Sequence, residues 1–239
     1  MKIVAAADIH GSCDRLAAVG AFALDNRADL ILLAGDICSI SRYNDFIYFV
    51  RHLSSHGRCP VILTPGNHDF WKPHKVFESA DRPYKELIGV EEYKSNGFKA
   101  RSRYGYGVLC LFDQQVDYRG IKIYGTPWIN YVNGKWNYEI PAQVDRSKYF
   151  VFPDDTDILL SHCCPFGYGD SVTNVDRVGS EELVMAVSMH SKLKYHIFGH
   201  CHENGGWTGR MNHTTLCNVS CCDGRNNTRY DGIMMFEID

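Results

Sequence analysis

Three short apolar runs dominate the first quarter of the chain. Residues 2–7, 29–34 and 59–63 are nearly continuous in apolar side chains, which is typical of strands buried on both faces of a sheet. Amphipathic segments follow the first two runs, with apolar residues at helical spacing over 14–26 and 44–55. Asp14 is a candidate N-cap for the first of these helices. This alternation predicts an α/β fold built on parallel strands.

The second half of the chain repeats the pattern less regularly. A helix is expected over residues 181–189, with Ser180 as its N-cap and two glutamates in its first turn. Residues 108–112 and 120–124 are predicted to pair with each other as two strands of a second sheet. Further strands are predicted at residues 157–160, 195–198, 216–222 and 232–238.

Polar side chains capable of chemistry follow these strands. Asp8 and His10 come after the first run, Asp36 after the second, and residues 67–69 (Asn-His-Asp) after the third. Asp8 alone could be an ordinary helix cap, but agreement between several strand ends is hard to obtain by chance. In open α/β sheets, ligands bind outside the carboxyl ends of the strands. Later strands end in histidines in the same way: His162, His200 and His202.

The residue types at these strand ends are typical of a metal centre. Seven candidate ligands exceed what one tetrahedral metal needs, so we expect two divalent ions that share the Asp36 carboxylate. Oxygen and imidazole ligands together favour Mn, Fe or Zn, and we expect Mn²⁺, with Fe or Zn as alternatives. Cys201 lies between two ligand histidines and should point away from the metals. The candidate ligands are Asp8, His10, Asp36, Asn67, His162, His200 and His202.

The third strand end also carries candidate catalytic residues. Neighbouring loop residues point in different directions, so we assign them different tasks. His68 is predicted to donate a proton to a leaving group, and Asp69 to orient His68. A hydroxide held between two cations would attack phosphorus in line with that leaving group.

Composition limits the classes of partner. The chain has 239 residues, of which 45% are hydrophobic and 22% charged, and no linker or low-complexity run divides it. We therefore expect one domain, residues 1–239. The net charge of −3 argues against bulk electrostatic binding to nucleic acid or to an anionic membrane. A small phosphoester, such as a nucleotide, remains a fitting substrate, and the sequence leaves a homo-oligomer open.

The expected compartment is the cytoplasm. We find no signal-peptide pattern at the start and no apolar run near the ~20 residues of a membrane helix. The ten cysteines do not form a disulfide framework, since adjacent pairs occur and two-residue spacings do not. Reduced thiols in a cytoplasmic protein fit this pattern.

The order of these motifs resembles that of the calcineurin-like metallophosphoesterases. Five motifs carry the resemblance: Asp8 with His10, Gly35-Asp36, residues 66–69, His162, and residues 199–202. Additional segments, at residues 124–128, 161–170 and 178–183, are similar to the MPPED-type subgroup, which is close to the class III cyclic nucleotide phosphodiesterases.

The resemblance implies a four-layer sandwich of two mixed β-sheets flanked by helices. It also implies two ligand sets: metal one would take Asp8, His10, Asp36 and His202, and metal two would take Asp36, Asn67, His162 and His200. His68 would protonate or stabilise the leaving group. The arginine that follows the Gly-Asp motif in the protein phosphatases is absent here, where residues 37–39 (Ile-Cys-Ser) stand, which argues against a phosphoprotein substrate.

The function predicted from the sequence is metal-dependent hydrolysis of phosphodiester bonds in a small nucleotide-type substrate. The alternatives are a phosphomonoesterase or nuclease on the same dinuclear scaffold, and a non-catalytic binding module. Two segments have open roles. The basic run 94–103 is either a solvated hairpin or a phosphate contact. The aromatic stretch 128–152 either stacks on a base or covers the core edge or a dimer contact. Its candidates for stacking are Trp128, Tyr131, Trp136, Tyr138 and Tyr149.

Overall fold

A computed structural model describes residues 1–39, 52–53, 56–69, 101–102, 105–106, 108–172 and 177–239. Most of the helix predicted over 44–55 lies outside the described residues, as does nearly all of the basic run 94–103. Within the described part of the chain, no helix has both the length and the apolar character that a membrane span requires.

The first sheet contains the three apolar runs with which the chain begins. They form β1 (Lys2–Ala6), β2 (Leu30–Ala34) and β3 (Val61–Thr64), and every residue of β2 and β3 is buried. β6 (Val108–Cys110) continues the sheet in parallel beyond β3, and β13 (Met234–Glu237) closes the other edge antiparallel to β1. The predicted buried parallel strands are therefore confirmed.

The second sheet is built from the later strands. In spatial order they are β11 (Thr208–Met211), β12 (Thr214–Asn218), β10 (Tyr195–Phe198), β9 (Ile158–Ser161), β8 (Ile121–Thr126) and β7 (Gln114–Tyr118). The four inner strands run parallel and the two edge strands run antiparallel, so this sheet is mixed like the first. A separate short hairpin pairs β4 (Arg101–Ser102) with β5 (Gly105–Tyr106).

Some predicted strands need correction. Residues 108–112 do not pair with 120–124, because β6 belongs to the first sheet and β8 pairs instead with β7. A two-residue turn connects β7 to β8, and both of its residues, Arg119 and Gly120, have positive φ, as tight hairpins require. β7 is an edge strand in which buried and exposed side chains are mixed, so it lacks the continuous apolar run that reveals a fully buried strand.

The closing strands are shorter than predicted. The predicted strand 216–222 ends at Asn218, and a short 3₁₀ helix, η3 (Tyr230–Gly232), occupies the start of the predicted strand 232–238. Two more 3₁₀ turns are η1 (Arg146–Tyr149) and η2 (His202–Asn204). The chain beyond β12 crosses between the sheets, where residues Ala7 and Ser220 form an isolated parallel bridge.

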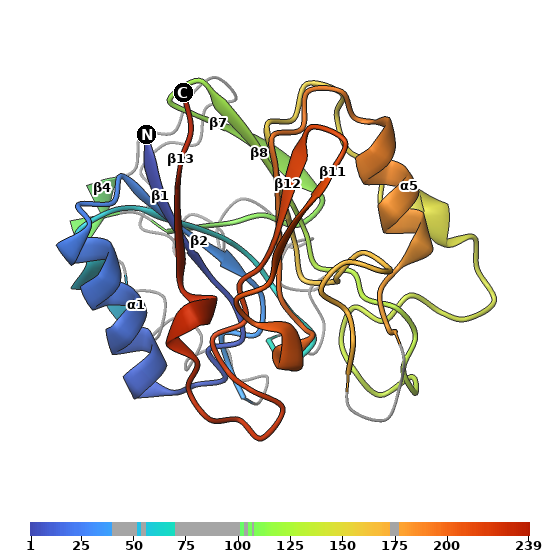
Figure 1. The fold of residues 1–239 in the computed structure, drawn as a ribbon, viewed down its shortest axis with the longest axis horizontal. Coiled ribbons are helices and arrows are strands. Elements are labelled where there is room, and N and C mark those ends of the chain that lie inside the picture. Colours follow the sequence, from blue (N-terminus) through green and yellow to red (C-terminus); the bar gives the residue numbers. More distant parts are fainter. Residues whose placement is uncertain (40–51, 54–55, 70–100, 103–104, 107, 173–176) are drawn as a thin grey trace.

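Helices cover the outer faces of the two sheets (Figure 1). α1 (Cys13–Asp25) lies outside the first sheet and α5 (Glu181–Met189) outside the second, which gives the expected four layers. The N-cap of α1 is Ser12 rather than Asp14, because the Ser12 hydroxyl accepts the Arg15 amide hydrogen at 3.3 Å. Ser180 caps α5 as predicted, accepting the Leu183 amide hydrogen at 3.1 Å.

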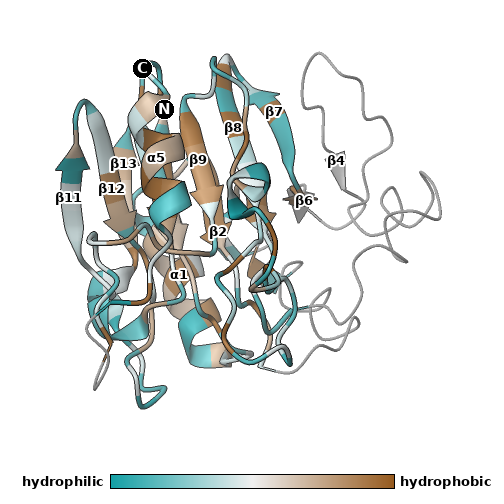
Figure 2. Ribbon diagram, turned by 90° about the vertical axis from the view of Figure 1, so that its right-hand side faces the viewer, coloured by the Kyte–Doolittle hydropathy of each residue, from teal (hydrophilic) through white to brown (hydrophobic). Residues whose placement is uncertain are grey.

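The main core lies between the sheets and beneath α1. Apolar colouring is concentrated on the central strands in Figure 2. β2 and β3 contact β8 and β9 across the interface between the sheets. A second apolar cluster fills the space between the second sheet and α5, and it includes Leu183, Val187 and Leu216. This double packing holds the carboxyl ends of the parallel strands of both sheets in fixed positions.

Candidate metal centre

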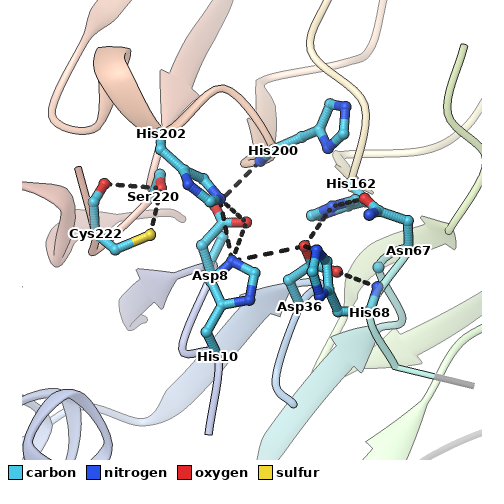
Figure 3. Close-up of polar contacts among 12 residues, drawn as sticks. Asp8, His10, Asp36, Asn67, His68, His162, His200, His202, Ser220 and Cys222 are labelled. Carbon is cyan, nitrogen blue, oxygen red and sulfur yellow. Dashed lines mark hydrogen bonds and ion pairs between the residues drawn. The ribbon is translucent and has the colours of Figure 1, made fainter. Parts of the chain in front are cut away.

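All seven predicted ligands lie at neighbouring strand ends of the two sheets. The loops after β1, β2 and β3 carry Asp8, His10, Asp36 and Asn67, and those after β9 and β10 carry His162, His200 and His202. Figure 3 shows these side chains drawn together from both sheets. We refer to Asp8, His10, Asp36 and His202 as site one, and to Asp36, Asn67, His162 and His200 as site two.

The backbone at the site adopts conformations that side chains rarely permit. Asp8, His10 and Asp36 have φ values of 59°, 47° and 54°, and His200 has 69°. Non-glycine residues in this left-handed region cost of order ~1–3 kcal/mol each, and such strain is concentrated at functional sites. The rest of the fold therefore holds these four residues in a backbone conformation that is locally unfavourable.

Two glycines let the backbone pass directly against ligand carboxylates. A Cβ at Gly66 would lie 2.2 Å from Asp36 Oδ1, and one at Gly199 would lie 2.6 Å from Asp8 Oδ2. Both distances are far below van der Waals contact, so no larger residue fits either position without displacing a ligand. This explains why glycine precedes the ligand residues in the third and fifth motifs.

Site one is gathered tightly enough to hold a cation. One ligand atom from each of its four residues lies within 4.8 Å of the others. His10 Nε2 and His202 Nε2 face each other at 3.1 Å, and His202 Nε2 is 3.3 Å from Asp8 Oδ1. Asp8 Oδ1 is fully buried and has no hydrogen-bond donor among the described residues. Carboxylate and imidazole lone pairs that converge in this way fit a divalent metal ion.

The electrostatics of site one are dominated by the pair of Asp8 and His202. Burial alone would raise the pKa of Asp8, but the neighbouring His202 outweighs it and lowers that pKa to about 2. Burial alone would lower the pKa of His202, but Asp8 outweighs it and raises that pKa to about 11. Without a metal, a proton on His202 would therefore supply the positive charge that the buried carboxylate needs.

Only three of the four residues of site two have their ligand atoms close together. His162 Nε2 lies 3.3 Å from Asp36 Oδ2 and 3.0 Å from Asn67 Oδ1. His162 Nδ1 lies 2.8 Å from the Ala34 carbonyl oxygen, which can only accept a hydrogen bond. Nδ1 must therefore carry the hydrogen, and Nε2 faces the site as a potential ligand. Asp36 Oδ2 also lies 3.7 Å from His10 Nε2, so this one oxygen faces both sites, as the predicted bridge requires.

The fourth residue of site two stands apart. The main-chain amide of His200 donates to Asp8 Oδ2 at 3.1 Å, which ties its backbone to the centre. In Figure 3, however, its ring extends away from Asp8 and Asp36. The ring meets that of His162 edge-on, with the centroids 5.0 Å apart. Burial lowers the pKa of His200 to about 3, so this ring is neutral and able to bind a metal.

His68 lies beside Asp36, at the edge of the ligand cluster. Its main-chain amide donates to Asp36 Oδ1 at 2.8 Å, and its Nε2 lies 4.0 Å from Asp36 Oδ2. Its Nδ1 lies 3.0 Å from the Ser39 carbonyl oxygen, so Nδ1 carries a hydrogen and Nε2 is directed toward the metal ligands. His68 Nε2 therefore lies beside the ligand cluster, and its role as proton donor stays a prediction.

The role predicted for Asp69 is wrong. One of its oxygens accepts the Gly66 amide hydrogen at 2.7 Å and the other accepts the Cys38 amide hydrogen at 2.9 Å. The Ser39 carbonyl, rather than Asp69, orients His68. Burial, together with the charge of Asp36, raises the pKa of Asp69 to about 7. Asp69 therefore fastens the two ligand loops to each other, a task that a sequence pattern does not distinguish from side-chain orientation.

The aromatic stretch divides into two groups. The Tyr138 side chain is buried, and Trp128 packs edge-on against Tyr149 with ring centroids 4.8 Å apart. These three cover the core edge. Trp136 is 42% exposed, and its ring centroid lies 4.5 Å from that of His68. Tyr131 is 45% exposed and lines a cleft beside the metal centre.

That cleft has a volume of about 520 Å³, within the usual range for small-molecule sites. His200 forms part of its wall, so the cleft adjoins site two. Two exposed rings and two basic side chains line it, together with acidic residues from the start of α5: Tyr131, Phe166, Arg146, Arg177, Glu181 and Glu182. Arg177 is held in place by an ion pair with the buried Asp170 at 2.8 Å. Sequence reasoning did not assign the two arginines to the site, because neither lies at a strand end.

Two cysteines near the centre behave differently. Cys201 is buried in the apolar cluster beneath α5, which agrees with the expectation that it points away from the ligands. Cys222 was not predicted to lie near the site, yet its Sγ lies within 4.8 Å of a ring nitrogen of both His10 and His202. The only sequence signal at this position is the adjacent pair Cys221-Cys222.

The chain is similar in sequence to several known proteins. The chain is 30% identical over 204 residues to a UPF0046 protein of Caenorhabditis elegans, covering 82% of this chain and 51% of that protein. It is 28% identical over 197 residues to Metallophosphoesterase domain-containing protein 1 of Homo sapiens, covering 81% of this chain and 60% of that protein. The chain thus spans a little over half the length of these relatives.

The fold recurs in solved structures. TT1561 of Thermus thermophilus superposes with a TM-score of 0.61 at 18% identity, covering 92% of this chain and 88% of that one. At this identity, the similarity concerns the fold alone. The family model described as calcineurin-like phosphoesterase matches residues 1–204, which include all seven candidate ligands and His68. With most of its length matched, the chain belongs to the calcineurin-like phosphoesterase family.

Proposed function

We propose that this chain hydrolyses phosphodiester bonds of a small nucleotide-type substrate and uses two divalent metal ions as cofactors. The observation that carries the proposal is the position of Asp36 Oδ2, which faces His10 on one side and His162 on the other. When bound, a pair of cations lowers the pKa of a water molecule and neutralises charge on a phosphoryl group. Asp8, His10 and His202 would complete one site, and Asn67, His162 and His200 the other.

His68 supplies the proton for the leaving group in this proposal. Its Nδ1 hydrogen is committed to the Ser39 carbonyl, so only Nε2 can exchange a proton with substrate. Nε2 lies 4.0 Å from Asp36 Oδ2, at the edge of the ligand cluster. Trp136 packs against His68 and limits its movement. Its exposed ring also offers a flat surface to a leaving group.

The cleft beside site two supports the nucleotide part of the proposal. Arg146 and Arg177 offer positive charge to phosphate oxygens, and Tyr131 and Phe166 offer exposed rings to a base. Glu181 and Glu182 would repel a polyanion, but they can accept hydrogen bonds from a sugar hydroxyl or a base amine. This mixture suits a compact nucleotide better than a long nucleic acid strand.

The choice between ester classes can be tested directly. The purified chain, loaded in parallel with Mn²⁺ or Zn²⁺, would be assayed on bis(p-nitrophenyl) phosphate, p-nitrophenyl phosphate, a cyclic nucleotide and a single-stranded oligonucleotide. We expect the highest kcat/KM on the cyclic nucleotide. Asp36→Asn, at the same metal concentrations, is the matched inactive control.

Other outcomes would replace the proposal. Faster hydrolysis of the monoester would make the chain a phosphomonoesterase, and preference for the oligonucleotide would make it a nuclease. Two bound metals without hydrolysis of any ester would favour a binding module. Tyr131→Ala would separate nucleotide recognition from general activity, because it should weaken only the reaction of the base-containing substrates.

A further inference from the structure

The segment after β12 carries a thiol to the edge of site one. The Sγ of Cys222 lies within 4.8 Å of a ring nitrogen of His10 and of His202, two of the four ligands of that site. Cys222 is fully buried. Figure 3 shows its side chain beside His202, on the side away from His162.

The backbone around Cys222 is held from several directions. Ser220 pairs with Ala7, the last residue before Asp8, and Cys222 pairs with Thr228 in a second isolated bridge. The Cys221 amide donates to the Ala7 carbonyl at 3.0 Å. These contacts join the segment to the same strand end that delivers Asp8, so the thiol keeps its place relative to site one.

A second observation points to a ligand at this place. Asp8 Oδ1 is fully buried, has no hydrogen-bond donor among the described residues, and faces His202. His10 Nε2 and His202 Nε2 lie 3.1 Å apart, and they form a hydrogen bond only when one of the two nitrogens carries a hydrogen. A cation among these groups would satisfy the carboxylate and both imidazoles, and the nearby sulfur could reach the same ion.

We propose that the Cys222 thiolate is an additional ligand of the metal at site one, and that it directs a thiophilic ion such as Zn²⁺ to this site. The inference rests on the proposed function only in requiring a metal there. Coordination replaces the S–H bond by a sulfur–metal bond, and the proton leaves to solvent. Sulfur favours Zn²⁺ over Mn²⁺, so site one, with a thiolate, differs in preference from site two, whose ligands are oxygen and nitrogen alone.

Cobalt spectroscopy tests this inference apart from catalysis. Co²⁺ replaces Zn²⁺ in similar sites and gives a near-ultraviolet charge-transfer band when a thiolate binds it. We expect that band in the wild-type chain and its loss in Cys222→Ser. The matched control is Cys221→Ser, which removes the neighbouring buried thiol whose Sγ lies 2.9 Å from the Ala7 carbonyl oxygen. This control should keep the band.

Affinity gives a second measurement. Cys222→Ser should weaken Zn²⁺ binding at site one by at least the ~10-fold that loss of a supporting residue causes. Mn²⁺ binding should change less. Should Cys222→Ser fail to fold, the ¹¹³Cd resonances of the wild-type chain still decide, because a sulfur ligand shifts one of two signals strongly downfield.

The outcomes separate this inference from the proposed function. A chain that binds two Co²⁺ ions and hydrolyses phosphodiesters without the charge-transfer band would overturn the thiolate ligand alone. Retention of the band in Cys222→Ser would do the same. A chain that binds no Co²⁺, Zn²⁺ or Mn²⁺ would overturn both.

Discussion

Asp36 divides the ligand cluster into two sites, and the backbone assembles one of them more completely than the other. In site one, all four residues already present their ligand atoms to one another within 4.8 Å. In site two, His162 and Asn67 face Asp36, but the ring of His200 turns toward the cleft. Asp8 raises the pKa of His202 to about 11, whereas burial lowers the pKa of His200 to about 3.

The difference suggests an order of metal binding. An ion at site one replaces a proton and needs little rearrangement, so its binding energy is not spent on moving a side chain. We expect that an ion at site two must also turn the His200 ring, which lines the cleft, toward Asp36. We therefore expect site one to fill first, and site two to fill at higher metal concentration or together with a substrate in the cleft.

Removing the Asp36 carboxylate should have the largest effect, because both sites then lose the ligand that they share. Asp36→Asn takes negative charge from both sites and should weaken both metals by more than the ~10–100-fold typical of a lost supporting contact. Isothermal titration with metal analysis of the dialysed protein measures this. Survival of one tightly held ion in Asp36→Asn would show that the two sites do not share this residue.

Loss of the proton donor should leave both sites intact. His68→Ala is expected to slow turnover by ~10²–10⁴-fold on esters with poor leaving groups, with metal content unchanged. The penalty should shrink for p-nitrophenolate, which departs without protonation. An equal loss on good and poor leaving groups would remove His68 from the role of acid.

Paired alanine variants measure the asymmetry itself. His202→Ala should lower the affinity of the first ion to bind, by ~10–100-fold or more, since it removes a ligand that is already in place. His200→Ala should affect only the second ion, and by less, because the ring must first be moved. Titrations that show the same loss of the same ion in both variants would contradict the order of filling.

A substitution in the cleft beside site two should have a smaller effect. Tyr131→Ala should raise KM for a nucleotide diester by ~5–150-fold, the equivalent of one lost base stack, and leave a small non-aromatic diester nearly unchanged. Tyr149→Ala is the matched control, because its ring packs on Trp128 instead. That control should lower Tm without favouring either substrate.

A histidine inside the second sheet should have no effect on either metal site and should change stability alone. His196 lies in β10, fully buried 2.8 Å from the Ser161 hydroxyl, and burial lowers its pKa to about 3. Since the unfolded chain takes up this proton below pH 6.5 and the folded chain does not, stability falls as the pH is lowered toward 3. Between pH 6.5 and 4.5 this amounts to ~2–3 kcal/mol.

His196→Gln should reduce that slope in urea titrations and leave metal content and turnover unchanged. Glutamine can still donate to the Ser161 hydroxyl, whose own hydrogen goes to the Cys163 carbonyl. An unchanged slope would place the acid sensitivity in the site histidines instead.

The sequence predicts the strand ends well because buried parallel strands are continuous apolar runs. That signal places Asp8, Asp36 and Asn67 just beyond three strands, and the later histidines follow by the same rule. It failed for β7, whose exposed edge position leaves Gln114–Tyr118 without a continuous apolar run. It also failed to assign β6 to its sheet, because pairing partners depend on the path of the whole chain.

Roles carried by the backbone were also beyond the sequence. The Ser39 carbonyl orients His68, and every residue has a carbonyl, so no pattern could single it out. Asp69 follows His68 directly, and adjacency suggested a partnership that the loop geometry does not allow. Arg146 reaches the cleft and Cys222 reaches site one from segments that are distant in the sequence, so no local pattern could assign them.

The left-handed backbone of Asp8, His10 and Asp36 has a consequence for protein engineering. Glycine adopts these φ values without strain, so substituting it at any of the three positions would relieve a local cost of order ~1 kcal/mol or more. Each such substitution would also delete a metal ligand. Substitutions chosen to relieve this strain would therefore remove ligands, and any programme to stabilise this fold must exclude the three positions from its design.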